Sequence, residues 1–159
     1  MDDPHVLIEH ARDHAHGGRY EEAIACYERA IAIAPEHAAH RLTIAELYFE
    51  LQRYDDATLS AEAHLALAPL DPRGWEALGR AHHLAGRARQ AAEALERAVA
   101  IAPAWGEALY HAALAWADLG RDLEAEDRLR RAIELDARYA PLAADEGLLE
   151  RYPDTIITR

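Results

Sequence analysis

Histidine is the side chain that most invites a chemical interpretation in this sequence, with ten copies in 159 residues. Three of them, His10, His14 and His16, lie close together near the start of the chain. On a helix, His10 and His14 would be one turn apart on the same face, a spacing at which two imidazoles can hold one metal ion. A complete site would need a third and a fourth ligand, and the sequence identifies no residue for either position. A histidine-based metal-binding or pH-sensing regulatory protein is therefore one alternative hypothesis.

Nucleophilic catalysis is the second chemistry to consider, and the sequence offers little for it. Ser60 has His64 four residues later, but a catalytic triad needs side chains that converge from several elements rather than from one helix surface. Cys26 is the single cysteine and has no CxxC context, which excludes a disulfide framework or a cysteine-based zinc site. We expect a protein that is not an enzyme and needs no cofactor.

Charge and hydropathy restrict the possible partners. The formal net charge of −12 repels polyanions, and no dense basic cluster offsets it. No run of eighteen apolar residues is present, and the chain begins Met-Asp-Asp-Pro, which is acidic where a secretory signal would be basic. We expect no nucleic-acid or membrane partner, and a cytoplasmic location.

The elements that must position these side chains are clearest in residues 72–103. The stretch contains a tryptophan, a Leu-Gly pair and a histidine, then an alanine, a leucine and a closing proline. These signature residues are Trp75, Leu78, Gly79, His82, Ala91, Leu95 and Pro103. The pattern resembles the tetratricopeptide repeat (TPR), a helix-turn-helix unit. Relative to that family, His82 replaces a tyrosine and Leu95 replaces a phenylalanine.

The same positions recur every 34 residues. The small residue that lets the two helices of a repeat approach is always alanine, at Ala23, Ala57, Ala91 and Ala125. The turn between the helices falls at Gly18, Gln52, Gly86 and Gly120. Glycine adopts the left-handed conformation that ends a helix at little cost, whereas Gln52 must adopt it under strain or use another turn.

The resemblance implies an all-α fold, a right-handed α-solenoid of four helix-turn-helix repeats plus a C-terminal capping helix. We expect a single domain over residues 1–152. Its repeats would span residues 4–37, 38–71, 72–105 and 106–139, followed by a capping helix over 140–152 and a short tail over 153–159. The expected helix pairs are 4–16 and 20–33, 38–51 and 54–67, 72–85 and 88–101, and 106–119 and 122–135. Gly147 would weaken the capping helix.

In the family that this sequence resembles, the first helices of the repeats line a concave groove that binds a segment of another protein. Projecting the repeat register onto those helices gives a lining of mixed apolar and charged side chains. The predicted groove residues are Ile8, Arg12, Leu42, Glu46, Phe49, Arg73, Glu76, Arg80, His83, Tyr110 and Leu114. Phe49, Tyr110 and Leu114 would be the anchors, because large apolar side chains on an exposed face contribute disproportionately to binding.

The resemblance predicts a non-catalytic protein–protein interaction module, an adaptor or scaffold within a larger complex. Chaperone-binding members grip a C-terminal carboxylate with a lysine and asparagine clamp, which Ile8, Arg12 and Arg73 do not reproduce. A second alternative is a self-assembling structural scaffold, so a homo-oligomer is possible. Some of the charged groove residues could instead pair between neighbouring helices of the protein itself.

Overall fold

The computed structural model describes residues 3–155, with the backbone alone at residues 37 and 38. Within this range every regular element is a helix and none is a strand. The chain divides into two compact units between Leu70 and Asp71, within one residue of the expected boundary between the second and third repeats. Each unit is described on its own below.

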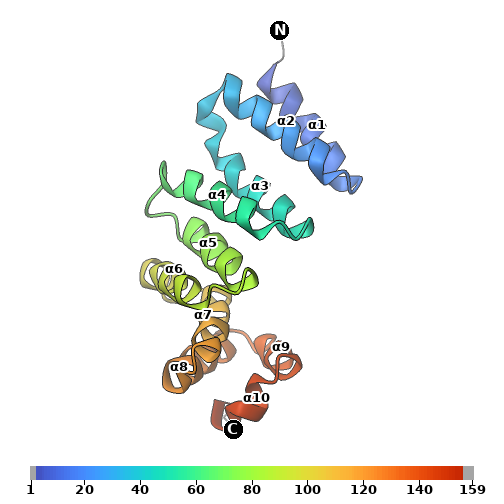
Figure 1. Ribbon diagram of the computed structural model, residues 1–159. Helices are drawn as coiled ribbons and strands as arrows, with labels where there is room; N and C mark the ends of the chain where they lie inside the picture. The colour runs from blue at the N-terminus through green and yellow to red at the C-terminus, as the bar shows by residue number, and fades with distance from the viewer. Residues whose placement is uncertain (1–2, 156–159) are drawn as a thin grey trace. The chain divides into compact units, whose positions relative to one another are not determined.

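The first unit contains two helical hairpins (Figure 1). Its helices are α1 (Pro4–His16), α2 (Tyr20–Ile33), α3 (His40–Glu50) and α4 (Tyr54–Leu65), with a 3-10 helix at Pro35–Ala39. Helix α1 begins where expected. The Asp3 carboxylate accepts a hydrogen bond from the backbone N–H of His5 at 2.9 Å, and Pro4 has no backbone N–H that would need an acceptor. Helix α3 starts two residues later than expected, because the 3-10 helix includes residues 38 and 39.

The second unit contains two further hairpins and the C-terminal cap (Figure 1). Its helices are α5 (Pro72–Leu84), α6 (Ala88–Ile101), α7 (Gly106–Asp118), α8 (Asp122–Leu135), α9 (Tyr139–Asp145) and α10 (Leu148–Arg151), followed by a 3-10 helix at Pro153–Thr155. The Asp71 carboxylate caps α5 by accepting from the backbone N–H of Arg73 at 3.0 Å. The four hairpin helices match their expected bounds to within one residue.

The cap consists of two short helices instead of the single helix expected over residues 140–152. Gly147 has φ +71°, a left-handed conformation that ends α9 and lets α10 start in a new direction. Two side chains attach the second helix to the start of α8. The hydroxyl of Tyr152 donates to the Asp122 carboxylate at 2.7 Å, and Arg151 donates to the same carboxylate at 2.6 Å. Residues 156–159 of the expected tail lie outside the described residues.

Small residues allow the two helices of each hairpin to pack closely. The four alanines that recur at 34-residue intervals, Ala23, Ala57, Ala91 and Ala125, are all fully buried. Helices α5 and α6 approach so closely that a Cβ added at Gly79 would lie 2.4 Å from Cγ of the fully buried Leu95. The leucine that replaces the usual phenylalanine is therefore packed directly against the glycine of the signature.

The hairpin turns share one backbone conformation. Gly18, Gly86 and Gly120 have φ between +70° and +75°, and Gln52 occupies the same position with φ +55°. Gln52 is the non-glycine residue with positive φ in the described chain. A side chain in this conformation costs roughly 1–2 kcal/mol, so the second repeat keeps the family's turn under strain.

We expect Gln52→Gly to raise the free energy of unfolding by about 0.5–1 kcal/mol. The substitution removes the strain, although the added flexibility of the unfolded chain cancels part of the gain. Urea unfolding followed by far-UV circular dichroism measures the change. Gly86→Gln, the reverse change at the matching turn, should lower the stability by a similar amount. A Gln52→Gly variant no more stable than the parent would contradict this account of the turn.

Candidate functional site

The predicted groove residues of the first unit lie in three different environments. Arg12 on α1 and Glu46 on α3 are exposed, and Leu42 and Phe49 on α3 are partly buried. Ile8 differs from the expectation of an open face, since only 5% of its surface is exposed. It belongs to the apolar cluster that includes side chains of α3, so it contributes to the core and is not available as a contact residue.

Most of the predicted groove residues in the second unit are also covered. Arg73 is exposed, while Arg80, His83 and Leu114 are partly buried and Glu76 is buried. Tyr110, expected as an anchor, is 7% exposed and stacks on Tyr139 of α9 with ring centroids 5.3 Å apart. Burial, with the nearby charges of Glu146 and Asp145, raises the pKa of Tyr110 to about 12. The cap covers this side chain, which a register projection without the cap could not anticipate.

Two histidine–carboxylate pairs connect α5 to α7. Nδ1 of His111 lies 2.6 Å from Oε1 of Glu76, and Nδ1 of His83 lies 3.2 Å from Oδ2 of Asp118. In both pairs the two residues are 35 positions apart, and the second pair is seven residues, two helical turns, further along both helices. Part of the predicted lining is therefore used to join neighbouring repeats. The 35-residue spacing is the sequence signal for these pairs, and His111 was not among the predicted site residues.

A third potential metal ligand joins the first of these pairs. One ligand atom each from Glu76, Glu107 and His111 lie within 4.8 Å of one another. Two ionised carboxylates this close together repel each other. A proton on His111 or a bound cation would offset this repulsion.

The histidines of the first helix do not form a comparable group. His10 and His16 are exposed, and Nδ1 of His14 accepts a hydrogen bond from Nε of Arg19 at 2.8 Å. Within residues 3–155, the side chains that converge in metal-ligand geometry are those of Glu76, Glu107 and His111. The metal-ligand cluster of this structure thus lies in the second unit, away from the cluster suggested by the sequence.

Each hairpin turn carries an arginine beside a ring from the end of the preceding helix. In two turns Nε of the arginine donates to a histidine Nδ1, and in the other two the guanidinium lies over an aromatic ring. The pairs are His14–Arg19, Tyr48–Arg53, His82–Arg87 and Trp116–Arg121. The arginine recurs with the 34-residue period, although it is absent from the family signature. This recurrence indicates that the ring residue five positions before each arginine has a packing role.

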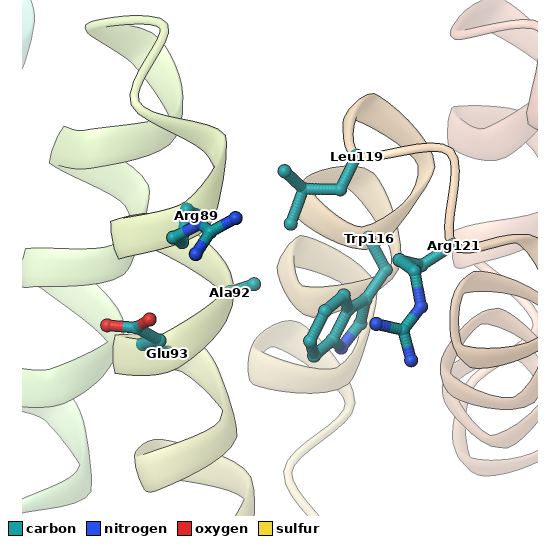
Figure 2. Close-up of a pocket in the computed structure, with 6 residues that line it drawn as sticks. All are labelled: Arg89, Ala92, Glu93, Trp116, Leu119 and Arg121. Atoms are coloured by element: carbon teal, nitrogen blue, oxygen red, sulfur yellow. The ribbon is translucent and has the colours of Figure 1, made fainter.

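A pocket of about 300 Å³ lies beside the last of these pairs (Figure 2). It is lined by Arg89, Ala92 and Glu93 of α6 and by Trp116, Leu119 and Arg121 at the end of α7 and the following turn. Arg89 forms no ion pair within the described residues. The lining combines an indole and two apolar side chains with the guanidinium groups of Arg89 and Arg121 and the carboxylate of Glu93. Arg121 is already paired with Glu124, so the pocket suits an apolar side chain with polar neighbours.

Behind Trp116, a polar network joins the third and fourth repeats. The carboxylate of Glu96 accepts from Nε1 of Trp116 at 2.9 Å and from both Nε and Nη2 of Arg128 at 2.9 Å each. Burial would raise the pKa of Glu96, but the hydrogen bonds from Arg128 and Trp116 and the charge of Arg128 outweigh it, so the pKa is lowered. The network fixes the indole that forms one wall of the pocket.

Comparison with known proteins identifies the family. Two sequence-family models, each described as "Tetratricopeptide repeat", match residues 15–81 and 72–104, which together make up more than half of the chain. The chain belongs to the tetratricopeptide repeat family. The TPR resemblance of its sequence is confirmed by these matches.

Two curated proteins are similar to this TPR chain over part of their length. It is 36% identical over 86 residues to the Hsp70-Hsp90 organizing protein of Triticum aestivum. It is 33% identical over 82 residues to the small glutamine-rich tetratricopeptide repeat-containing protein 2 of Saccharomyces cerevisiae. The matches cover 54% and 52% of this chain but 15% and 24% of those proteins. The chain therefore spans less than a quarter of the length of either relative.

Solved structures show the same fold. A crystal structure of MamA has a TM-score of 0.80 at 18% identity and covers 96% of this chain and 87% of that one. MamA from Desulfovibrio magneticus RS-1 has a TM-score of 0.77 at 22% identity, over 86% of this chain and 77% of that one. A thermophilic TPR protein of Thermus thermophilus has a TM-score of 0.72 at 20% identity, over 96% and 88%. The expected fold class, an all-α solenoid of TPR repeats, is confirmed.

We expect Glu96→Gln to lower the free energy of unfolding by about 1–2 kcal/mol at pH 7, because the partly buried Arg128 keeps its ion pair with Asp127 but loses the carboxylate to which two of its nitrogens donate. A lowered pKa means that the ionised carboxylate stabilises the fold above the ordinary value of 4.5. That contribution is lost as the pH falls through the folded-state pKa. Urea unfolding of parent and variant between pH 7 and 3 should therefore show their difference shrinking toward the acidic end.

Glu93→Gln is the matched control for this test, since Glu93 lies on the same helix and is exposed. It should change the stability by less than about 0.5 kcal/mol at every pH. A pH-independent loss in Glu96→Gln would show that packing, rather than the charge of the carboxylate, stabilises this network.

Proposed function

We propose that this TPR protein is a non-catalytic interaction module that binds a segment of another protein along the faces of its first helices. The observation that carries the proposal is that these helices keep accessible side chains of several kinds. Arg12 and Arg73 are exposed, and Phe49 and Leu114 remain partly accessible. Such a surface suits an amphipathic segment, which places apolar side chains beside charged ones.

The TPR relatives support a protein partner. One is named an Hsp70-Hsp90 organizing protein, a name that refers to other proteins. We propose by analogy that the present chain also acts as an adaptor or scaffold, with its repeats and cap forming one domain. Because the predicted face has no lysine and asparagine clamp, the bound segment would be internal to the partner and would not present a C-terminal carboxylate.

The net charge of the chain restricts the kind of partner that it can bind. None of the helices within residues 3–155 combines the length and the apolar character needed to cross a bilayer. The net charge of −12 disfavours anionic lipid headgroups and nucleic acid alike. A protein segment that carries basic as well as apolar side chains is the partner whose charge best matches this chain.

Self-assembly remains the second candidate, and the exposed apolar side chains favour it. Leu59 on α4, Leu67 and Leu70 after it, and Leu123 on α8 are each more than 60% exposed. A scaffold that joins copies through these leucines would show a mass that rises with concentration in light scattering. A constant monomer mass up to high concentration would remove this candidate.

We expect the double substitution Phe49→Ala and Leu114→Ala to abolish capture of the protein's specific partners. These side chains are the two predicted anchors of the face that remain partly accessible, and loss of a hot-spot side chain costs about 2 kcal/mol or more, a roughly thirtyfold loss of affinity. Affinity capture from host lysate with the full chain as bait, followed by quantitative mass spectrometry, identifies the partners. Titration with each purified partner then measures the loss.

The matched control is Leu59→Ala with Leu123→Ala, which removes apolar side chains of the second helices that are 63% and 82% exposed. This control variant should keep full binding. If it loses partners while the first-helix variant retains them, the binding face belongs to the second helices and the proposed site is wrong.

A further inference from the structure

A cluster of three potential metal-ligand side chains lies between α5 and α7 of the second unit, two helices that pack against each other. Glu76 extends from α5, and Glu107 and His111 extend from α7. Because Glu107 and His111 are four residues apart, they lie on the same side of α7, one turn from each other. Three ligand-type side chains from two elements thus converge to within 4.8 Å.

The burial of Glu76 distinguishes this cluster from a group of surface acids. Its side chain is 6% exposed and that of His111 is 17% exposed. Within the described residues, the hydrogen-bond and ion-pair partner of the Glu76 carboxylate is His111 alone. A buried carboxylate normally has an arginine, a lysine or several backbone N–H groups as partners. Here the surrounding protein supplies only an imidazole.

The carboxylate of Glu107 forms no hydrogen bond or ion pair within residues 3–155, although the charge of Arg138 acts on it from further away. The arginines nearby are committed elsewhere. Arg73 pairs with Asp71 at 2.8 Å, and Arg138 pairs with Asp136 at 2.9 Å and donates to the hydroxyl of Tyr139. With a neutral imidazole, the cluster therefore carries two negative charges that no neighbouring cation pairs with directly.

We propose that Glu76, Glu107 and His111 bind a divalent transition metal ion of the zinc type. Imidazole nitrogens and carboxylate oxygens are both zinc ligands, and a site with three protein ligands leaves the fourth position for a water molecule. Metal–ligand bonds of about 2.0 Å place tetrahedral ligands roughly 3.3 Å apart. Side-chain rotations that move each atom by about 1 Å bring the three atoms to that spacing. Calcium is disfavoured because it requires six to eight oxygen ligands.

The ion would join the third repeat to the fourth. Because the ligands come from both α5 and α7, they are held together only in the folded second unit, so binding stabilises that unit by mass action. In the metal-free protein, the hydrogen bond between Glu76 and His111 holds the same two helices. Glu76 is also one of the predicted groove residues, but the test of the metal site needs no partner, so the two proposals can fail separately.

The test is a zinc titration of the full chain at pH 7 by isothermal calorimetry, with Co²⁺ absorption as a second readout. We expect one ion per chain and a visible Co²⁺ spectrum typical of tetrahedral coordination. His111→Ala and Glu107→Gln should each weaken binding at least tenfold. Zinc should also raise the Tm of the parent, reversibly with a chelator, but not the Tm of either variant.

Two comparisons separate this site from others. The double variant His10→Ala and His14→Ala removes the histidine pair of α1 and should bind zinc as the parent does. Glu107→Gln keeps the shape of a side chain that has no hydrogen-bond or ion-pair partner and removes one of two neighbouring like charges, so its metal-free Tm should equal or exceed that of the parent even if His111→Ala unfolds. No stoichiometric binding, or binding lost with His10 and His14 and kept in Glu107→Gln, would overturn the proposal.

Discussion

The close approach of the two helices within each hairpin is the constraint on which the rest of this structure depends. At the crossing points the chain has alanine, and Ala23, Ala57, Ala91 and Ala125 are all fully buried. A larger side chain at these positions would separate the helices and open voids, each costing about 1 kcal/mol or more. A single hairpin has too little apolar surface to stabilise itself, so neighbouring hairpins must complete the core.

This packing was predictable because it is local and repeated. Alanines, turn glycines and closing prolines at a 34-residue period determined the helix bounds, and Asp3 and Asp71 marked the helix starts by their capping geometry. The turn at Gln52 was also expected to be strained, and its φ of +55° shows that the repeat keeps its conformation at a cost. Each of these features depends only on a residue and its neighbours in sequence, so it can be predicted from one amino-acid sequence.

The candidate site was less predictable, because exposure depends on which elements cover a residue. Ile8 and Tyr110 have the right register for an open face, yet both are buried, Tyr110 by the stacked ring of Tyr139. The position of the Tyr139 ring depends in turn on the absence of a side chain at Gly106, where a Cβ would lie 2.7 Å from that ring. The repeat register predicts which face of its own helix a residue occupies, but not which residue of another helix it contacts. The contact of His111 with Glu76 was therefore not predicted.

The two histidine–carboxylate pairs show how a repeat protein divides the same surface between stability and recognition. Repeats three and four use Glu76, His83, His111 and Asp118 to connect α5 with α7, while the equivalents of Glu76 and His111 one repeat earlier are Leu42 and Ala77. The polar junction is therefore a property of these two copies and not of the fold. Since an apolar pair packs helices at least as well as a partly buried ionisable pair, packing alone does not account for the polar choice. Ligand binding at Glu76, Glu107 and His111 would account for it.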